Sequence, residues 1–335
     1  MKALVLQEKG QLPVFGEQPH PVATSGEALV RVAAAALNHR DIWIMHGQYP
    51  GITLPIILGS DGTGRVESVC DGEESWVGQD VIINPSIGWG DNPEYQANDF
   101  TILGLPRSGT FAEYISVPIE NLVPKPDHLT APQAAALPLA GLTAWRALVT
   151  RAQAQAGDKV LISGVGGGVA LFAAQFAIAL GCEVYVTSGS DSKIEQATDL
   201  GAAGGVNYRS EDFLKEASAL SPKGFDIVID SAGGEGFGDL VRLLGPGGRL
   251  AFYGGTCGRW PTLLPQHMFY KQVSILATTM GSPKDFSDMV AFINTTKLVP
   301  VVDRVFTAKD GDQAFSHLDS GKQFGKVVLS FEETT

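Results

Sequence analysis

The chain has 335 residues, 44% of them hydrophobic, and a formal net charge of −12 at pH 7. A chain of this length and apolar content can bury more than one core, so we expect two domains. The negative charge argues against nucleic acid or an anionic membrane as the main partner.

We expect neither a membrane span nor an export signal from this sequence. The longest apolar stretch, residues 169–180, is interrupted by Gln175 and is too short for a bilayer, and residues 1–10 lack the apolar core of a signal peptide. The three cysteines are few, odd in number and widely spaced, as is typical of reduced thiols. We therefore expect a cytoplasmic protein without disulfides.

Short β-branched runs separated by Gly and Pro fill the first 125 residues and predict an all-β domain. The expected strands are Lys2–Leu6, Glu27–Ala34, Gly64–Val69, Asp80–Asn84 and Phe111–Pro118. The segment Asn84–Gly109 is predicted to form a long loop.

From Ala131 onward, expected helices and strands alternate, which is typical of a parallel sheet with crossover helices. These elements are expected at 130–137, 141–150, 159–163, 169–180, 183–187, 226–230, 236–244, 249–253 and 274–279. The remaining sequence predicts a helix near Asp285–Thr295 and a strand at Lys326–Ser330.

A glycine-rich turn follows the first strand of the alternating region. Residues 159–175 read KVLISGVGGGVALFAAQ, in which Val169 begins a predicted helix with one apolar stripe. The glycines are Gly164, Gly166, Gly167 and Gly168. A strand that turns tightly into a helix presents backbone N–H groups and a positive dipole end to a diphosphate. Because Val169 stands at the third glycine position of G-x-G-x-x-G, an ordinary glycine-rich turn is the alternative.

The next strand ends at Ser188, where NAD-selective enzymes carry an acidic residue for the ribose hydroxyls. Ser192 and Glu195 match a capping box, which predicts a helix beginning there with Lys193 in its first turn. A hydroxyl and an ammonium in place of a carboxylate favour a 2′-phosphate, so the sequence predicts NADP(H). The alternative is that Lys193 is a solvated surface residue and Ser188 only ends the strand.

Six short motifs occur in the order and spacing of the medium-chain dehydrogenase/reductase superfamily. They are ALNHRD (Ala36–Asp41), LGSDG (Leu58–Gly62), AGLTAW (Ala140–Trp145), the glycine turn, GA with VNY (Gly201–Tyr208) and FYGG (Phe252–Gly255). The sequence most resembles the zinc-less quinone oxidoreductase (ζ-crystallin-like) branch, over nearly the whole chain. This resemblance implies a GroES-like β-rich catalytic domain at 1–127, an inserted Rossmann NADP-binding domain with a doubly wound parallel sheet at 128–281, and a C-terminal segment at 282–335 that completes the first domain.

Metal ligands are missing at the positions that the resemblance assigns to them. Zinc-dependent members carry Cys, His and a further Cys or acidic residue where this chain has Asn38, Ser60 and Leu139. These three residues cannot form a Cys/His zinc site, and residues 84–109 lack the four cysteines of a structural zinc site. The six histidines show no ligand spacing. We therefore expect a metal-free enzyme.

Without a Lewis acid, hydride transfer from a nicotinamide needs an acceptor that is already electrophilic, such as a quinone or an α,β-unsaturated carbonyl. Asn38 and Asp41 match the N-x-x-D pattern of the quinone oxidoreductase branch, which implies that Asn38 lies near the nicotinamide or the acceptor carbonyl. Asp41 is expected mainly to hold the loop, because an acid with an ordinary pKa of about 4 is a poor proton donor at neutral pH. Tyr49 or bulk water is the expected proton source.

The resemblance implies further cofactor contacts. The matched positions are Thr143, Tyr208, Gly254, Gly255, Thr256 and Lys326. Thr143 is expected near the nicotinamide carboxamide or a phosphate, and the residues from 254 to 256 along the nicotinamide ribose. Tyr208 is expected to close over the 2′-phosphate, with Arg209 as an auxiliary charge. For Lys326 the alternative is a lysine that starts an edge strand and blocks edge-to-edge pairing.

The segment Val273–Thr279 is apolar and is predicted at a sheet edge, where a second copy of the chain would cover it. A homodimer is therefore expected, and a tetramer remains open. Two other functions also remain open. One is a zinc-type alcohol dehydrogenase that acts on an alcohol or aldehyde, and the other is a non-catalytic, crystallin-like protein that binds NADPH.

Overall fold

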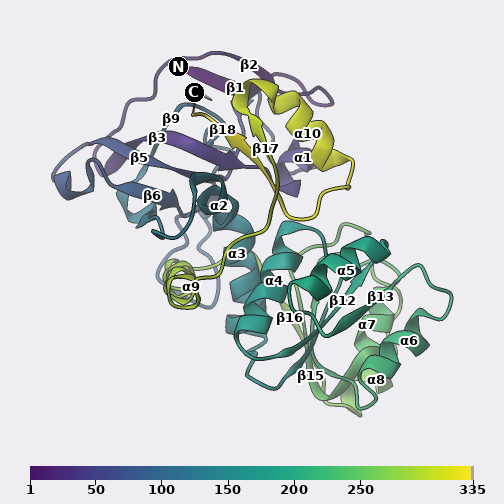
Figure 1. The fold of residues 1–335 in the computed structure, drawn as a ribbon. Helices are drawn as coiled ribbons and strands as arrows, with labels where there is room; N and C mark the ends of the chain where they lie inside the picture. The colour runs from purple at the N-terminus through teal and green to yellow at the C-terminus, as the bar shows by residue number, and fades with distance from the viewer. Residues whose placement is uncertain (333–335) are drawn as a thin grey trace. The chain divides into compact units, whose positions relative to one another are not determined.

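The computed structural model describes residues 1–332, which form two compact units. Unit 1 joins Met1–Leu142 to the segment that begins at Gly281, and unit 2 is the inserted stretch Thr143–Met280 (Figure 1). This is the expected architecture of a β-rich domain interrupted by a parallel-sheet domain.

The first boundary lies further along the chain than the sequence predicts. Residues 128–142, which we expected in the second domain, belong to unit 1. The reason is the packing of α2 (Ala131–Ala136), whose alanines form a buried cluster with Ala34 and Val328 of unit 1.

A seven-stranded sheet forms the body of unit 1. Its strand order is β10-β6-β5-β3-β18-β17, and β9 also pairs with β3. The strands are β3 (Glu27–Ala36), β5 (Asp61–Val69), β6 (Asp80–Ile83), β9 (Tyr114–Pro118), β10 (Leu122–Pro124), β17 (Val302–Thr307) and β18 (Lys326–Ser330). A second sheet pairs β1 (Lys2–Leu6) with β2 (Val14–Glu17) and β4 (Ile56–Ile57). Phe111 and Phe315 meet edge to face in the core of this unit, with ring centroids 5.9 Å apart.

Unit 1 is not all-β, contrary to the sequence prediction for its first part. Besides α2 it contains α1 (His39–Met45), α9 (Pro283–Thr296) and α10 (Gly311–Asp319), and α3 (Pro138–Trp145) begins in it. With seven residues, α1 is too short to display a helical period in the sequence. The expected loop at 84–109 also contains a small sheet of β7 (Ser86–Ile87) and β8 (Thr101–Ile102).

Unit 2 is built on a six-stranded parallel sheet in the order β13-β12-β11-β14-β15-β16, with helices packed against it (Figure 1). Its strands are β11 (Lys159–Ile162), β12 (Glu183–Ser188), β13 (Gly204–Asn207), β14 (Phe225–Asp230), β15 (Leu244–Phe252) and β16 (Ser274–Ala277). Its helices are α4 (Gly168–Ala179), α5 (Asp191–Asp199), α6 (Phe213–Leu220), α7 (Phe237–Leu243) and α8 (Gln266–Phe269). The strand order reverses between β11 and β14, as in doubly wound sheets.

Strand β13 has no strand signal in the sequence, because it begins with two glycines. Gly205 is required there by space: a Cβ would lie 2.6 Å from the Val186 carbonyl oxygen and 2.8 Å from the Ile194 side chain. The close approach of β12 and α5 therefore selects glycine over a residue that favours strands.

No helix within residues 1–332 combines the length and the apolar content that a bilayer span requires.

Gly64 gives the first testable prediction, because β3 passes directly over it. A Cβ at Gly64 would lie 2.0 Å from the Arg31 carbonyl oxygen and 2.9 Å from Val32 Cα, both backbone atoms of the paired strand. Gly64→Ala should therefore lower the free energy of unfolding by about 2–3 kcal/mol. Gly16→Ala on β2 is the control, since no atom lies within 4 Å of its added Cβ. Chemical denaturation compares the two, and equal losses would contradict the prediction.

Candidate active site and cofactor site

Asn38 lies at the corner between β3 and α1. It is the N-cap of α1, with φ −126° and ψ 156°, and its backbone N–H donates to Asp41 Oδ2 at 2.8 Å. N–H groups at a helix start have no partner within the helix, and the Asp41 carboxyl satisfies one of those near this start. Asn38 and Asp41 form a capping box, in which the Asn38 side chain faces the Asp41 backbone N–H.

The Asn38 amide lies between a carboxylate and an ammonium. Its Nδ2 donates to Asp61 Oδ2 at 2.9 Å, and Lys326 Nζ donates to Asn38 Oδ1 at 2.6 Å and to Asp61 Oδ2 at 2.8 Å. The second carboxylate oxygen, Asp61 Oδ1, accepts from the Leu139 backbone N–H in the first turn of α3 at 2.6 Å. All three side chains are buried, and Asp61 is fully so. We call Asn38, Asp61 and Lys326 the buried triad.

A second polar group lies along the same segments. Arg40 donates from Nη1 to Ser60 Oγ at 2.7 Å and to the Leu103 carbonyl oxygen at 2.9 Å, and Ser60 Oγ donates to that same oxygen at 2.7 Å. The Arg40 guanidinium lies over the Tyr49 ring, 5.2 Å from its centroid. The structure therefore places Tyr49, the expected proton source, against a cation.

Asp41 is fully buried, and burial raises the pKa of its carboxyl to about 6, against the opposing effects of the Arg40 charge and the Asn38 N–H. Its Oδ1 has no hydrogen-bond partner within residues 1–332. The premise of an ordinary pKa near 4 is therefore wrong, because the sequence does not reveal how deeply this carboxyl is buried.

The residues at the expected metal positions do not fit zinc. Asn38 Oδ1 and both Asp61 oxygens already accept N–H donors, Ser60 is committed to Arg40 and Leu103, and the adjacent Lys326 ammonium would repel a dication. Across residues 1–332, no three or more His, Cys, Asp or Glu side chains are grouped to hold a metal ion.

In unit 2 the glycine turn connects β11 to α4. Gly164 and Gly166 have φ of +68° and +127°, values that L side chains rarely adopt. The turn is held to β12, because Gly164 N donates to Thr187 Oγ1 at 3.2 Å and Val165 N to the Thr187 carbonyl oxygen at 2.7 Å. Gly167 is the N-cap of α4 and Val169 lies in its first turn, so backbone N–H groups face outward without a capping side chain. This geometry fits a diphosphate.

Lys193 reaches back over the glycine turn. Its Cδ and Nζ lie 2.8 and 3.2 Å from the point where a Cβ on Gly166 would stand. Helix α5 begins at Asp191 with Ser190 as N-cap, so the expected capping box of Ser192 and Glu195 is wrong. The helix starts two residues earlier than expected. Its N-cap Ser190 has an extended backbone, and the Ser190 Oγ is hydrogen bonded to Ser192 Oγ. Lys193 remains in the first turn.

Tyr208 and Arg209 close over the end of β12. The Tyr208 hydroxyl and Arg209 Nε lie 2.7 and 2.8 Å from the point where a Cβ on Gly189 would stand. The neighbouring Ser188 is buried, and its Oγ accepts from Ser190 N at 3.3 Å. The structure thus gathers Tyr208 and Arg209 at Ser188 and Gly189, while Lys193 covers the adjacent turn.

Most of the remaining expected cofactor residues form hydrogen bonds or strand pairs within the protein. Thr143 is buried, and its Oγ1 donates to Met280 Sδ at 3.9 Å. Gly254, Gly255 and Thr256 follow β15, where Thr256 N donates to the Ser231 carbonyl oxygen at 3.3 Å. Lys326 does not start an edge strand, because β18 pairs with β3 on one side and β17 on the other. That alternative is therefore wrong.

Two acidic residues were missed by the sequence analysis. Asp61 stands in the LGSDG motif shortly after the apolar run Ile56–Leu58, and a carboxylate at this place is the signal that could have identified it. Asp230 ends β14 and accepts from Ser163 Oγ and from Gly233 N, the latter at 2.9 Å. It ties the ends of β11 and β14 at the point where the strand order reverses, which is where such sheets bind ligands.

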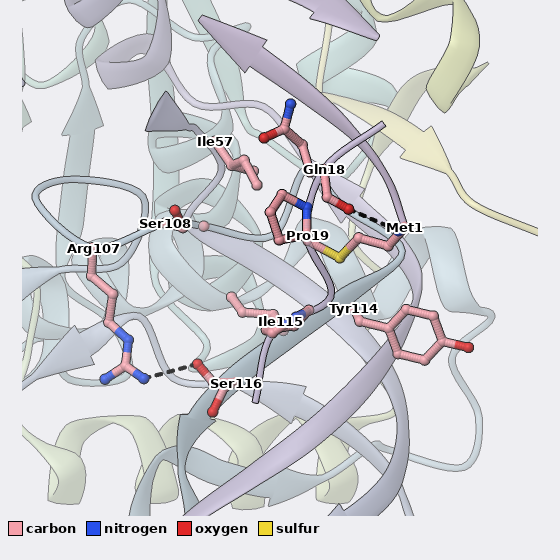
Figure 2. A pocket seen from close by; sticks show the side chains of 11 residues that line it. Met1, Gln18, Pro19, Ile57, Arg107, Ser108, Tyr114, Ile115 and Ser116 are labelled. Carbon is pink, nitrogen blue, oxygen red and sulfur yellow. Dashed lines mark hydrogen bonds between the residues drawn. The ribbon is translucent and has the colours of Figure 1, made fainter. Parts of the chain in front are cut away.

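A cavity of about 400 Å³ in unit 1 lies apart from these residues (Figure 2). Met1, Pro19, Ile57 and Tyr114 contribute to its wall, and none of the expected site residues lines it. Its Arg107 is paired with Glu27 and also donates to the Ser116 carbonyl oxygen. Its charged groups are therefore already paired, and we assign no chemistry to it.

Comparison with known proteins identifies the family. Residues 24–127 match the family described as "Alcohol dehydrogenase GroES-like domain", and residues 168–295 match "Zinc-binding dehydrogenase". A relative from Leptosphaeria maculans, "Zinc-type alcohol dehydrogenase-like protein YogA", is 38% identical over an alignment of 330 residues that covers 92% of this chain and 92% of the relative. A solved structure titled "NAD-dependent alcohol dehydrogenase" is 37% identical with a TM-score of 0.93 and covers 99% of this chain and 100% of that chain.

A "cobalt and zinc bound thermostable alcohol dehydrogenase" from Pyrobaculum aerophilum is 28% identical, with a TM-score of 0.87 and coverage of 98% and 99%. The chain belongs to the medium-chain dehydrogenase/reductase superfamily. It is an oxidoreductase that uses a nicotinamide cofactor.

The raised pKa of Asp41 predicts a pH-dependent stability. A folded-state pKa above the unfolded value favours the folded state at low pH, and this contribution is lost as pH rises through about 6. Asp41→Asn keeps an oxygen for the Asn38 N–H but carries no charge. Relative to the parent, it should therefore gain about 1.4 kcal/mol of stability between pH of about 5 and about 8.

Thermal unfolding at the two pH values measures this gain. Asp127→Asn, at an exposed carboxyl of the same unit, is the control and should show none. A stability difference between parent and Asp41→Asn that is independent of pH would contradict the prediction.

Proposed function

We propose that the protein uses NADPH to reduce a quinone or an α,β-unsaturated carbonyl without a metal ion, as in the zinc-less branch that it resembles. The orientation of the Asn38 amide carries this proposal. Its Oδ1 faces the Lys326 ammonium and its Nδ2 faces the Asp61 carboxylate. The reversed amide would set NH₂ against an ammonium and a carbonyl oxygen against a carboxylate, so the charges of the neighbours determine the orientation.

This orientation leaves Asn38 with one kind of group for a ligand. One Nδ2 hydrogen is donated to Asp61, and the second has no acceptor within residues 1–332. An N–H donor is complementary to the oxygen of a carbonyl or quinone, and it stabilises the negative charge that develops there.

The protein's part in the reaction is to position the acceptor and stabilise its oxygen. NADPH, when bound, supplies the hydride. Asn38 holds the acceptor oxygen through Nδ2 as the acceptor carbon takes up the hydride, and water or the Tyr49 hydroxyl supplies the proton. Because quinones and enones are electrophilic before they bind, orientation and one donor supply the catalysis that a Lewis acid provides elsewhere.

Names of the relatives favour a second candidate, a zinc-type alcohol dehydrogenase. The buried triad opposes it, because every oxygen of Asn38 and Asp61 already accepts an N–H donor and an ammonium lies between them. We therefore prefer the metal-free reductase.

A preference for NADP(H) is supported by the cations of unit 2. Lys193 lies over the glycine turn, and Tyr208 and Arg209 lie at the end of β12, where the chain has Ser188 in place of an acid. The nearby Asp191 carboxylate accepts from Asn207 Nδ2 at 2.8 Å, which engages one of its oxygens. We also propose a homodimer, because β16 ends the described strand order of its sheet and Tyr270, four residues before it in the chain, is 79% exposed.

NADPH should bind at least about tenfold more tightly than NADH, because one charge-assisted contact to the 2′-phosphate accounts for that factor. Lys193→Ala should weaken the binding of NADPH but not of NADH, which makes the two affinities more alike. Lys215→Ala, at an exposed lysine of the same unit, should leave both affinities unchanged. Fluorescence titration of the parent and both variants with each cofactor measures the six dissociation constants. Equal affinities of the parent for NADPH and NADH would contradict the preference.

Replacement of Asn38 tests the proposed reaction. Asn38→Ala removes the donor, and Asn38→Asp keeps the shape but has no N–H. Both should lower turnover with quinones and enones by about tenfold or more while the NADPH dissociation constant changes by less than about twofold. Asn294→Asp, at an exposed position of α9, is the matched control.

Steady-state NADPH oxidation over a panel of acceptors gives the turnover numbers. If the Asn38 variants match the parent, Asn38 is structural. If the parent oxidises no NADPH with any acceptor, the non-catalytic alternative replaces this proposal.

A further inference from the structure

Lys326 is a charged side chain in the interior of a sheet. It begins β18, which pairs with β3 and β17, and only 4% of its surface is exposed. The residues that follow it in the strand, from Val327 to Leu329, are core residues. Strand packing therefore does not explain a lysine here, and lysines are almost never buried unless they are paired.

The pairing of Lys326 is incomplete in a specific way. An ammonium has three hydrogens. Two of them are donated to Asn38 Oδ1 and Asp61 Oδ2, and the third has no acceptor within residues 1–332. A lysine needed only to neutralise Asp61 would not also have to bond to the Asn38 amide.

The bond to Asn38 controls what that amide can do. Asp61 disfavours the reversed amide because the carbonyl oxygen would then face its carboxylate, and Lys326 disfavours it further because the NH₂ group would then face its ammonium. Without the ammonium, Oδ1 loses its charged donor and the amide is held less firmly against the carboxylate. The donor that Asn38 presents to an acceptor therefore depends on Lys326.

We propose that Lys326 is a positioning residue of the active site, which fixes the Asn38 amide and keeps a positive charge beside the acceptor oxygen. This inference rests on the proposed reduction of a carbonyl or quinone. It differs from the cofactor contact that the resemblance implies for Lys326, and it gives an ammonium the electrostatic role that a metal ion has in zinc-binding members. No direct contact between Lys326 and the cofactor is required.

The test compares Lys326→Met, Lys326→Arg and the double variant Lys326→Met/Asp61→Asn with the parent. Lys322→Met, at an exposed lysine four positions earlier, is the control. The double variant removes the unpaired carboxylate that could unfold Lys326→Met, so a folded protein without the ammonium is available. For each variant we would measure kcat, the KM for the quinone, the NADPH dissociation constant and thermal stability.

Lys326→Met and the double variant should lose about tenfold or more in kcat, with NADPH affinity within about twofold of the parent. Lys326→Arg should recover part of the loss, because it restores the charge. A purely structural lysine would leave the folded Lys326→Met variant fully active. A lysine that binds the cofactor would weaken NADPH binding instead. Either result would overturn the inference while leaving the proposed function intact.

Chemical rescue provides an independent readout. Lys326→Ala leaves space for a small amine, so methylammonium or ethylammonium should restore turnover in a saturable way, whereas the bulkier tetramethylammonium should not. Failure of every small amine to raise the turnover of a folded Lys326→Ala variant would count against the proposed charge. A parent that oxidises no NADPH would remove the proposed function and this inference together.

Discussion

The ion pair between Lys326 and Asp61 is the interaction on which the proposed site depends. It joins residues 265 positions apart in the chain, and Asn38 and the Leu139 N–H add further hydrogen bonds to it. Two charges buried in a sheet are stable only when each is paired and hydrogen bonded, and loss of one partner typically costs about 3–5 kcal/mol. The end of β3, the start of β5, the first residue of β18 and the first turn of α3 are thus held by one small network.

The proposed metal-free reaction is supported by this network, although residues 168–295 match a family described as zinc-binding. Metal sites need deprotonated or neutral donors with free lone pairs. Here the corresponding oxygens accept N–H donors, and the nearby serine is occupied by Arg40 and Leu103. The positive charge at this site is the ammonium of Lys326. A fixed ammonium and an oriented amide suit the polarisation of an existing carbonyl, whereas formation of an alkoxide from an alcohol needs a stronger Lewis acid.

The regular features of the fold could be predicted from the sequence because they follow from local patterns. The strands Lys2–Leu6 and Lys326–Ser330 have the expected bounds, and the glycine turn lies between a strand and a helix as expected. Prediction failed where a residue distant in the sequence determines which side chain fits. Gly205 belongs to a strand because Val186 and Ile194 leave no room for a side chain.

In the candidate site, too, local patterns predicted single residues but not their partners. Asn38, Lys193 and Tyr208 could be named from motifs, but the partners that define their chemistry lie far away in sequence. The bond from Lys326 to Asn38 spans 288 positions, so no pattern along the chain indicates that the two side chains meet. The pKa of Asp41 could not be anticipated either, because the desolvation that raises it depends on the complete packing around α1.

The central claim is that the Lys326 ammonium stands in the site in place of a metal ion, and metal analysis of the active enzyme tests it most directly. We predict that purified, dialysed protein contains less than about 0.1 zinc per chain and oxidises NADPH at an unchanged rate in excess chelator. A stoichiometry of about one zinc per chain that survives dialysis, with activity lost on its removal and regained on its return, would contradict the account.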